Sequence, residues 1–264
     1  MRRITYILLA IIVTITNNSI SISAQEAIDL GLPVMWASLN LGAKSIEDFG
    51  EYYAWGELEP KTGEYSFTES NYRFSKPGES SWEWIVTKYN KDDQKKTLEL
   101  LDDAAQVKLG GNWRMPTKEE YEMLVNTSFL QWKWTTLNGV NGYKITSKRA
   151  GYEGNWIFIP AAGAYRRDSL EDKNSVGRYW TSSLSFGEDY IHVIDFNESG
   201  ASEYTEVNRL STGLPIRPVW DKNAASAAPS HQTKPATNTT SKRLPGESNA
   251  EYVARRARQG DGFK

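Results

Sequence analysis

The chain of 264 residues contains no cysteine and only two histidines. Without cysteine it has no disulfides, no thiolate nucleophile, no iron–sulfur cluster and no cysteine-ligated zinc. Two histidines also leave little material for a multi-histidine metal site or for a separate Ser/His/Asp triad. The rest of the composition, with 39% hydrophobic and 24% charged residues, is ordinary for a globular protein and names no ligand.

Residues 1–24 have the pattern of a secretory signal peptide. Arg2 and Arg3 give a positive start, an apolar run covers Ile4 to Ile15, and a small-residue stretch ends at Ala24. The alternative is a retained membrane anchor, but the apolar run is shorter than the ~20 residues of a spanning helix. We predict cleavage after Ala24, export of the protein and no membrane span after cleavage.

Residues 222–264 differ in composition from the rest of the chain. Asn223 to Thr240 is almost entirely Ala, Ser, Thr, Pro and Asn, which bury too little apolar area to offset the entropy of ordering. The segment carries eight Lys or Arg against three Asp or Glu, a net charge of +5. We predict a flexible linker and a basic tail, which is either solvated or in contact with the cell envelope.

Residues 25–221 form the single predicted domain. They carry 21 Lys or Arg against 30 Asp or Glu, and this net charge of −9 argues against nucleic acid as the main partner. All ten tryptophans of the chain lie in this range. Because aromatic side chains bury large areas, they tie long loops to a core, and the pattern predicts few long elements.

Helix signals occur in two short stretches of this domain. Residues 102–109 begin with an aspartate cap and are followed by Gly110 and Gly111, which predicts one short helix. Pro116 and the capping box of Thr117 and Glu120 predict a second helix of about ten residues.

The remaining signals are those of strands and turns. They predict strands at 36–41, 52–55, 132–136, 143–146, 156–159, 190–196 and 214–219. The dipeptides Asn138-Gly139 and Asn141-Gly142 are typical turn sequences between the third and fourth of these strands. Pro215 and Pro218 each remove a backbone donor, so we expect the last strand at an edge or with a bulge.

A series of motifs runs through the domain in a specific order. It includes Asp29-Leu-Gly-Leu-Pro33, Gly50-Glu-Tyr-Tyr-Ala-Trp-Gly-Glu57, Gly110-Gly-Asn-Trp-Arg-Met-Pro-Thr117, Tyr179-Trp-Thr-Ser-Ser183 and Gly213-Leu-Pro-Ile-Arg-Pro-Val219. Over residues 29–219 this series resembles the FISUMP (Fibrobacter succinogenes major paralogous) domain family. The resemblance implies an α+β, C-type-lectin-like domain with two short helices and a loop-rich, twisted antiparallel sheet.

The same fold hosts formylglycine-generating enzymes, whose Trp-Arg-Leu-Pro-Thr segment is similar to Trp113–Thr117 here. That branch works through copper bound by cysteine thiolates, so the absence of cysteine excludes its oxidase route. We interpret the segment as structural instead: Thr117 caps a helix, Trp113 packs, and Arg114 meets a carboxylate or helix-end carbonyls.

Residues 165–209 are the expected ligand-binding segment. Related lectin-like proteins display their binding face in the C-terminal half, and Tyr, Arg and Asn side chains suit stacking and directional hydrogen bonds. The predicted ligand-binding residues are Tyr165, Arg166, Tyr179, Phe186, Asp189, Tyr190, His192 and Arg209. The alternative is a plain polar surface, with His192 as a hydrogen-bonded strand residue. Trp180 and Arg217 are predicted to belong to the core.

Paired carboxylates offer a second type of chemistry. They occur at Asp92/Asp93, Asp102/Asp103, Glu119/Glu120, Glu171/Asp172 and Glu188/Asp189. A glycosidase needs two such groups at a defined separation, which a sequence does not reveal. For calcium, the oxygen-rich positions are Glu188-Asp189 and Asn197-Glu198, without a contiguous ligand loop. We predict no metal ion, no cofactor and no catalytic residue.

These features together predict an exported, non-enzymatic recognition module. It would bind a saccharide or protein ligand in the periplasm, at the cell surface or as a secreted protein. The alternatives are a structural subunit of a surface assembly and a carboxylate-dependent hydrolase of envelope or dietary polymers.

Overall fold

The computed structural model describes residues 25–61, 67–126, 128–185, 187 and 189–224. The chain divides into two compact units, Met1–Ser226 and Ala227–Lys264, and the described residues all belong to the first. The predicted signal peptide and all but the first residues of the predicted tail lie outside the described residues.

The described residues contain two α-helices and two single-turn 3-10 helices. These are α1 (Ala104–Leu109), α2 (Lys118–Val125), η1 (Glu69–Asn71) and η2 (Leu100–Asp102). The Asp103 carboxylate accepts hydrogen bonds from the backbone of Ala105 and Gln106 and so caps α1, which ends at Gly110. Thr117 and Glu120 form the capping box of α2. Both predicted helices are therefore confirmed.

Strands make up most of the regular structure in the described ranges. They are β1 (Ala27–Ile28), β2 (Val34–Ala37), β3 (Ser75–Pro77), β4 (Trp84–Val86), β5 (Trp113–Arg114), β6 (Leu130–Leu137), β7 (Val140–Ser147), β8 (Trp156–Pro160), β9 (Ala164–Arg166), β10 (Ser169–Glu171), β11 (Val176–Leu184), β12 (Tyr190–Asn197), β13 (Gly200–Asn208), β14 (Thr212–Gly213) and β15 (Val219–Asp221).

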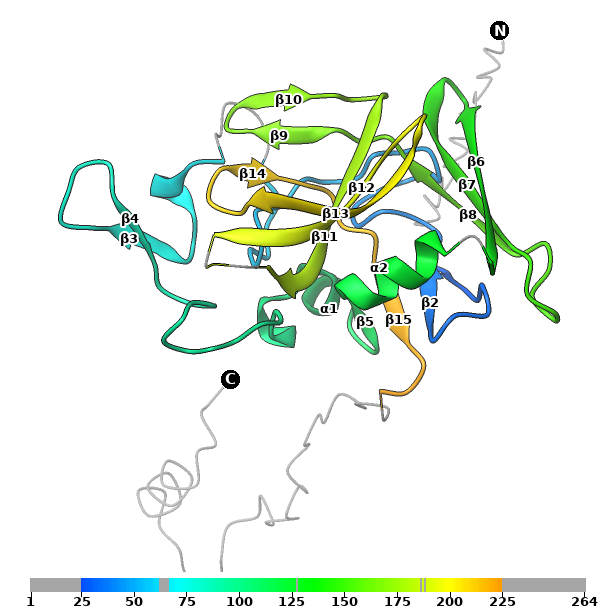
Figure 1. The fold of residues 1–264 in the computed structure, drawn as a ribbon, viewed down its shortest axis with the longest axis horizontal. Coiled ribbons are helices and arrows are strands. Elements are labelled where there is room, and N and C mark those ends of the chain that lie inside the picture. Colours follow the sequence, from blue (N-terminus) through cyan, green and yellow to red (C-terminus); the bar gives the residue numbers. More distant parts are fainter. Residues whose placement is uncertain (1–24, 62–66, 127, 186, 188, 225–264) are drawn as a thin grey trace, which may run out of the picture. The chain divides into compact units, whose positions relative to one another are not determined.

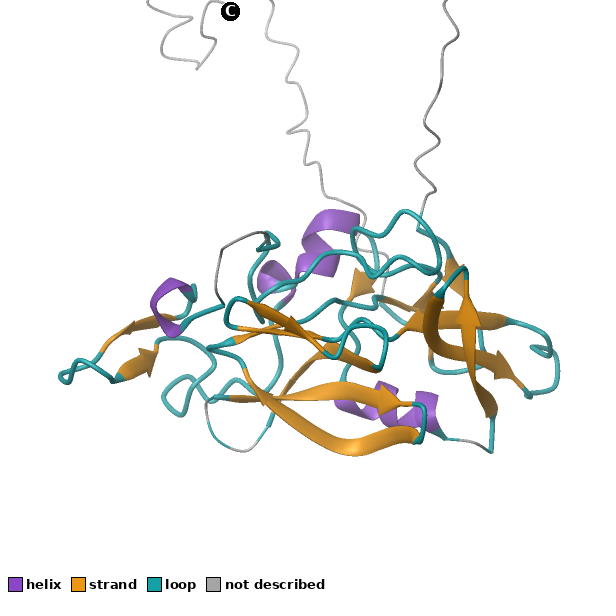
Figure 2. Ribbon diagram, turned by 90° about the horizontal axis from the view of Figure 1, so that it is seen from above, coloured by secondary structure: helices purple, strands orange, loops and turns teal. Residues whose placement is uncertain are grey.

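These strands form small antiparallel sheets. Their orders are β1-β2-β15-β5, β10-β9-β14, β11-β12-β13, β3-β4 and β6-β7-β8. Figure 1 shows them along the chain, and Figure 2 shows how few helices accompany them. The described part is thus mostly antiparallel sheet with two short α-helices, in agreement with the predicted α+β class.

The β6–β7 hairpin shows which turn signal was correct. Asn138 and Gly139, both at positive φ, connect the two strands, and Leu137 pairs with Val140. Asn141-Gly142, by contrast, lies inside β7, so the prediction of a second turn there is wrong. Gly142 pairs with Pro160 of β8, and a Cβ at this position would collide with the Ile159 carbonyl. The glycine therefore serves close strand packing.

Three strand predictions are corrected by the structure. The strand expected at 36–41 is β2, which begins at Val34 and ends at Ala37. Tyr53 makes only an isolated bridge to Leu214, so residues 52–55 are not a strand. The last strand begins at Val219 and not at Leu214. It pairs regularly with β2 and β5 on its two sides, so the expected edge position or bulge is also wrong. Pro215 and Pro218 lack backbone donors, and the carbonyls of both accept hydrogen bonds from neighbouring segments instead.

The interior contains two clusters of buried side chains. One surrounds Trp55 and Trp180, and the other surrounds Trp36, Tyr121 and Phe196. Helix α2 lies against β6, β11, β12 and β13 and contributes Tyr121 to the second cluster.

Arg217 is also fully buried, as predicted for a core residue. Its guanidinium donates to the carbonyls of Ala37 at 2.9 Å and Phe158 at 2.6 Å, which ties β2 to β8.

Candidate functional site

A cluster of aromatic rings joins the β6–β7–β8 sheet to the β11–β12–β13 sheet. Tyr143 of β7 lies 4.9 Å from Trp132, 5.1 Å from Trp134 and 5.5 Å from Phe196, measured between ring centroids. Phe196 and Tyr143 are buried, whereas the two tryptophans of β6 are half-buried. The cluster therefore has a core end and an end that reaches the surface.

Trp132 is held in place by the end of helix α2. Its indole Nε1 donates to the Leu124 carbonyl at 2.8 Å. Carbonyls in the last turn of a helix have no partner within the helix, so this bond satisfies one of them. It also sets the orientation of the indole ring relative to α2.

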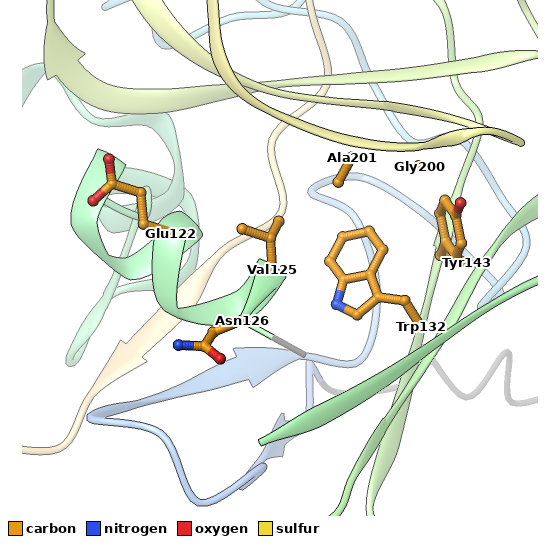
Figure 3. A pocket seen from close by; sticks show the side chains of 7 residues that line it. All are labelled: Glu122, Val125, Asn126, Trp132, Tyr143, Gly200 and Ala201. Carbon is orange, nitrogen blue, oxygen red and sulfur yellow. The ribbon is translucent and has the colours of Figure 1, made fainter. Parts of the chain in front are cut away.

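A groove runs between α2, the β6–β7 hairpin and the start of β13. We call it the Trp132 groove, and its volume is about 630 Å³, within the range of roughly 300–1,000 Å³ usual for small-ligand sites. The residues that line it are Glu122, Val125, Asn126, Trp132, Tyr143, Gly200 and Ala201. Figure 3 shows the Trp132 ring between Val125 and Tyr143, with Gly200 and Ala201 above it.

The polar groups of the Trp132 groove come from one helix. Glu122 forms an ion pair of 3.7 Å with Lys118 one turn earlier in α2. The Asn126 side-chain oxygen accepts from the Ser128 backbone at 3.0 Å, which leaves the amide nitrogen as the donor that this side chain can offer. A carboxylate and an amide thus line the α2 side of the groove, on the same side of the indole.

Tyr143 supports the far side of the groove. Its hydroxyl donates to the carbonyls of Asn197 at 3.0 Å and Glu198 at 3.4 Å, which ties β7 to the β12–β13 turn. Burial and the nearby Glu198 carboxylate raise the pKa of Tyr143. The hydroxyl therefore stays protonated at neutral pH and continues to donate.

Two of the predicted ligand-binding residues are buried and are corrected here. Tyr179 is fully buried, and its hydroxyl donates to the Pro160 carbonyl at 2.5 Å. Arg209 is also fully buried, and its guanidinium donates to the Tyr89 carbonyl at 3.0 Å and lies 5.4 Å from the Trp55 ring centroid. Neither side chain is accessible to a ligand at the surface.

The other predicted residues are divided among separate elements. Tyr165 of β9 is half-buried between Tyr52 and Phe67, with ring centroids 5.0 and 5.5 Å away. Next to it, the exposed Arg166 pairs with Glu171 at 3.0 Å.

Asp189, Tyr190 and His192 belong to the β11–β12 end of another sheet. The Asp189 carbonyl accepts from the Arg209 backbone at 2.8 Å, and Tyr190 is 46% exposed. Phe186 lies outside the described residues. The predicted set is therefore split between the core, β9 and this end of β12.

His192 lies beside a carboxylate and a hydroxyl without forming a catalytic triad. Its Nδ1 is 3.8 Å from Glu206, and Ser185 donates its hydroxyl proton to the same carboxylate. The carboxylate thus stands between the serine and the imidazole, whereas nucleophile activation needs the imidazole next to the hydroxyl. Burial and the charge of Lys118 lower the pKa of His192, so the ring is neutral at pH 7.

The carboxylate pairs at the helix starts have structural partners. Asp102 is buried and accepts from Lys88 at 2.5 Å and from the Tyr89 hydroxyl at 2.6 Å. Asp103 caps α1 and also accepts from the Met115 backbone at 2.7 Å. Burial raises the pKa of Asp103 to about 6, against the effect of these backbone donors.

Arg114 meets carboxylates as predicted. Its guanidinium binds both oxygens of Glu120, at 2.8 and 2.6 Å, and one oxygen of Asp221 at 3.1 Å. This bidentate pair links β5 and β15 to the first turn of α2. The Trp113–Glu120 segment is therefore built as a structural junction.

Sequence reasoning did not find the Trp132 groove. The strand signal at 132–136 and the capping box were both recognised, yet neither indicates that Asn126, Trp132 and Gly200 meet. The available signal was the alternation of Trp132 and Trp134 with polar residues, which marks a half-buried face.

Comparisons with protein-family models, curated proteins and solved structures return no match for this chain. Among the described residues, no cluster of three or more His, Asp or Glu side chains is placed to hold a metal ion. The helices of the described part are all too short or too polar to cross a bilayer.

Proposed function

We propose that this chain is an exported, non-catalytic recognition module that binds a saccharide in the Trp132 groove. The observation that carries the proposal is a half-buried indole that lines one groove together with a carboxylate and an amide from the α2 side. The indole of Trp132 offers a flat face for the C–H groups of a sugar ring. Glu122 and Asn126 offer an acceptor and a donor for its hydroxyls.

The groove is held in its binding geometry before any ligand arrives. The Leu124 carbonyl orients Trp132, and the Ser128 backbone orients the Asn126 amide. Binding then orders few additional side chains, which lowers its entropic cost.

The charge of the protein favours a neutral saccharide. Residues 25–221 have a net charge of −9, and one of their acidic residues, Glu122, lines the groove itself. Anionic polymers would be repelled by both. We therefore expect unsulfated saccharides without uronic acids as ligands.

A non-catalytic role is supported by the structural contacts that several acidic residues form. Asp102, Asp103 and Glu120 are engaged in ion pairs and helix caps that hold the fold. A protein ligand, a hydrolase and a structural subunit remain the competing functions, and the experiment below separates them from saccharide binding.

The fold family and the location of the protein belong to the same proposal. The order of motifs over 29–219, together with antiparallel sheets and two short helices, supports a FISUMP domain of C-type-lectin-like fold. Export is supported by the signal-peptide pattern of residues 1–24, and envelope contact by the basic composition of 222–264.

The test is affinity electrophoresis of the purified protein in native gels containing mannan, laminarin, xyloglucan or starch, each with calcium or with EDTA. We expect retardation by at least one polymer, and loss of that retardation in Glu122→Ala and Asn126→Ala. Trp156→Ala is the matched control, because this tryptophan of β8 is 39% exposed and does not line the groove.

Several outcomes would contradict the proposal. Retardation that survives both groove variants would place saccharide binding elsewhere, and loss of retardation with EDTA would indicate a metal site. Binding only to proteins from an extracellular panel would support a protein ligand. Release of reducing ends from a polymer would establish a hydrolase, and constant self-association without any ligand would support a structural subunit.

A further inference from the structure

The β3–β4 hairpin carries an exposed aromatic side chain at its tip. Trp82, in the turn between the two strands, is 82% exposed, and Trp84 follows two residues later at the start of β4. Figure 1 shows this hairpin projecting from the rest of unit 1. A tryptophan exposed to this degree has an unfavourable contact with water, which a ligand would remove.

Both tryptophans line one groove together with an ion pair. We call it the hairpin groove. Its volume is about 420 Å³, and its lining residues are Glu69, Trp82, Trp84, Arg167 and Leu210. Arg167 Nη2 lies 3.1 Å from Glu69 Oε1. The groove therefore presents two indoles beside a guanidinium and a carboxylate whose charges compensate each other.

Backbone contacts hold the tip of the hairpin. The Gly78 N–H donates to the Glu83 carbonyl at 2.9 Å, and the Glu83 N–H donates to the Ser80 carbonyl at 3.0 Å. These bonds close the turn on either side of Trp82. The Ser75 hydroxyl also donates to the Glu69 carbonyl, which fixes η1 relative to β3.

Backbone hydrogen bonds also hold Arg167, which lines the other side of the hairpin groove. The Arg167 N–H donates to the Ser211 carbonyl at 3.1 Å, and its own carbonyl accepts from Phe67 at 2.7 Å. Arg167 adopts φ 57°, a left-handed conformation that a non-glycine residue rarely adopts without such support. The backbone of Arg167 is therefore fixed by the β9–β10 turn, and its guanidinium is oriented by Glu69.

We propose that the hairpin groove is a second saccharide-binding site, separate from the Trp132 groove. A sugar ring can stack on an indole, and its hydroxyls both donate and accept, which suits the two partners of the Arg167–Glu69 pair. Because that pair carries no net charge, the groove favours a neutral ligand over an anion or a charged peptide.

Two sites on one chain select for polymers. The two grooves share no lining residue and no strand, and in both views the β3–β4 hairpin lies away from the β6–β7 hairpin within unit 1. A polysaccharide bound at one groove has a high effective concentration at the other, so its apparent affinity exceeds that of either site. The expected preference for polymers depends on saccharide binding in the Trp132 groove. The proposal that the hairpin groove binds a saccharide does not depend on it.

The test uses titration calorimetry of the full chain with mannohexaose, laminarihexaose and maltohexaose, and affinity electrophoresis with the corresponding polymers. We expect two hexasaccharides per chain in the unaltered protein and one in Trp82→Ala. Polymer affinity should fall about tenfold or more in this variant. Leu101→Ala is the matched control, since Leu101 is also 82% exposed but lines neither groove.

A second variant distinguishes this site from the Trp132 groove. If Asn126→Ala loses one hexasaccharide and Trp82→Ala loses the other, both sites are established. If only Trp82→Ala loses binding, the hairpin site holds and the proposed function of the Trp132 groove fails. If Trp82→Ala retains the stoichiometry and polymer affinity of the unaltered protein, or if none of the probes binds, the second site is overturned.

Discussion

The indole Nε1 of Trp132 donates a 2.8 Å hydrogen bond to the carbonyl of Leu124, eight residues earlier in the chain. This bond joins the last turn of α2 to the first half of β6 across the connection between them. It places one edge of the indole against the helix while the ring lines the groove. A single contact thus contributes to stability and shapes the surface that we propose binds saccharide.

Replacement of Trp132 with phenylalanine should separate these two contributions. The Trp132→Phe variant keeps a ring in the groove but leaves the Leu124 carbonyl without its donor, which we expect to cost about 1 kcal/mol of unfolding free energy. Urea denaturation measures this cost. Trp156→Phe, at an exposed edge of β8, is the control and should change stability by less than about 0.5 kcal/mol. Equal losses in the two variants would contradict the role of the bond.

Removal of the cap of α2 should weaken the helix that supplies Glu122 and Asn126. The Thr117 hydroxyl accepts from the Glu120 backbone at 3.3 Å. We expect Thr117→Ala to lower the unfolding free energy by about 1 kcal/mol, and Thr117→Ser, which keeps the hydroxyl, to have little effect. Thermal or urea unfolding of the two variants side by side checks the prediction, and a serine variant as unstable as alanine would contradict it.

Asp102 should make the protein sensitive to acid. Although burial opposes the effect, hydrogen bonds from Lys88 and Tyr89 and the charge of Arg73 lower the pKa of Asp102 from its ordinary value of 3.8. The unfolded chain therefore binds a proton at this group at a higher pH than the folded chain. The stabilisation is complete above about pH 4 and is lost as the pH falls through the folded value.

The Asp102→Asn variant tests this prediction. We expect it to be less stable at pH 7 by about 2 kcal/mol, because Lys88 and the Tyr89 hydroxyl lose a charged acceptor. The difference from the unaltered protein should shrink as the pH is lowered from 5 to 2, as measured by urea unfolding at each pH. A difference that stays constant over this range would contradict the shifted pKa.

Gly163 and Gly151 offer a comparison between a steric clash and backbone strain. Both have positive φ, but a Cβ at Gly163 would collide with the Glu171 carbonyl, whereas one at Gly151 meets no atom within 4 Å. We expect Gly151→Ala to cost about 1 kcal/mol from strain and Gly163→Ala to cost roughly 3 kcal/mol. Urea unfolding of both variants gives the values, and similar costs would show that the β9–β10 hairpin yields around the clash.

Local patterns in the sequence predicted the helix caps and the β6–β7 turn, but they did not reveal the strands β11 and β13. The aspartate before α1, the capping box of α2 and the Asn138-Gly139 turn each act through hydrogen bonds or φ angles within a few residues. Such features depend little on the rest of the chain, so they can be recognised without it. The strand at 214–219 was misplaced because Pro215 and Pro218 prevent pairing even though the side chains suit a strand.

Burial was harder to predict than element type. Tyr179 and Arg209 have side chains typical of binding surfaces, yet both are fully buried. In β11 the residues from Tyr179 to Ser182 are all buried, so this strand is covered on both faces and lacks the alternation that would reveal its orientation. Arg209 is accommodated by the carbonyls of Lys88 and Tyr89, which are 121 and 120 residues away in sequence.

The sequence by itself determined the short helices and the β6–β7 hairpin, because caps, turns and alternating side chains act over a few residues. It also determined the charge of residues 25–221 and the exclusion of cysteine chemistry. Only the tertiary structure decided which polar side chains are accessible and where the two grooves lie. Packing between separate sheets and helices brings together the residues of each groove. These are Asn126, Trp132 and Gly200 in the Trp132 groove, and Glu69, Trp82 and Arg167 in the hairpin groove. That packing is the sum of many long-range contacts, and no single local motif encodes it.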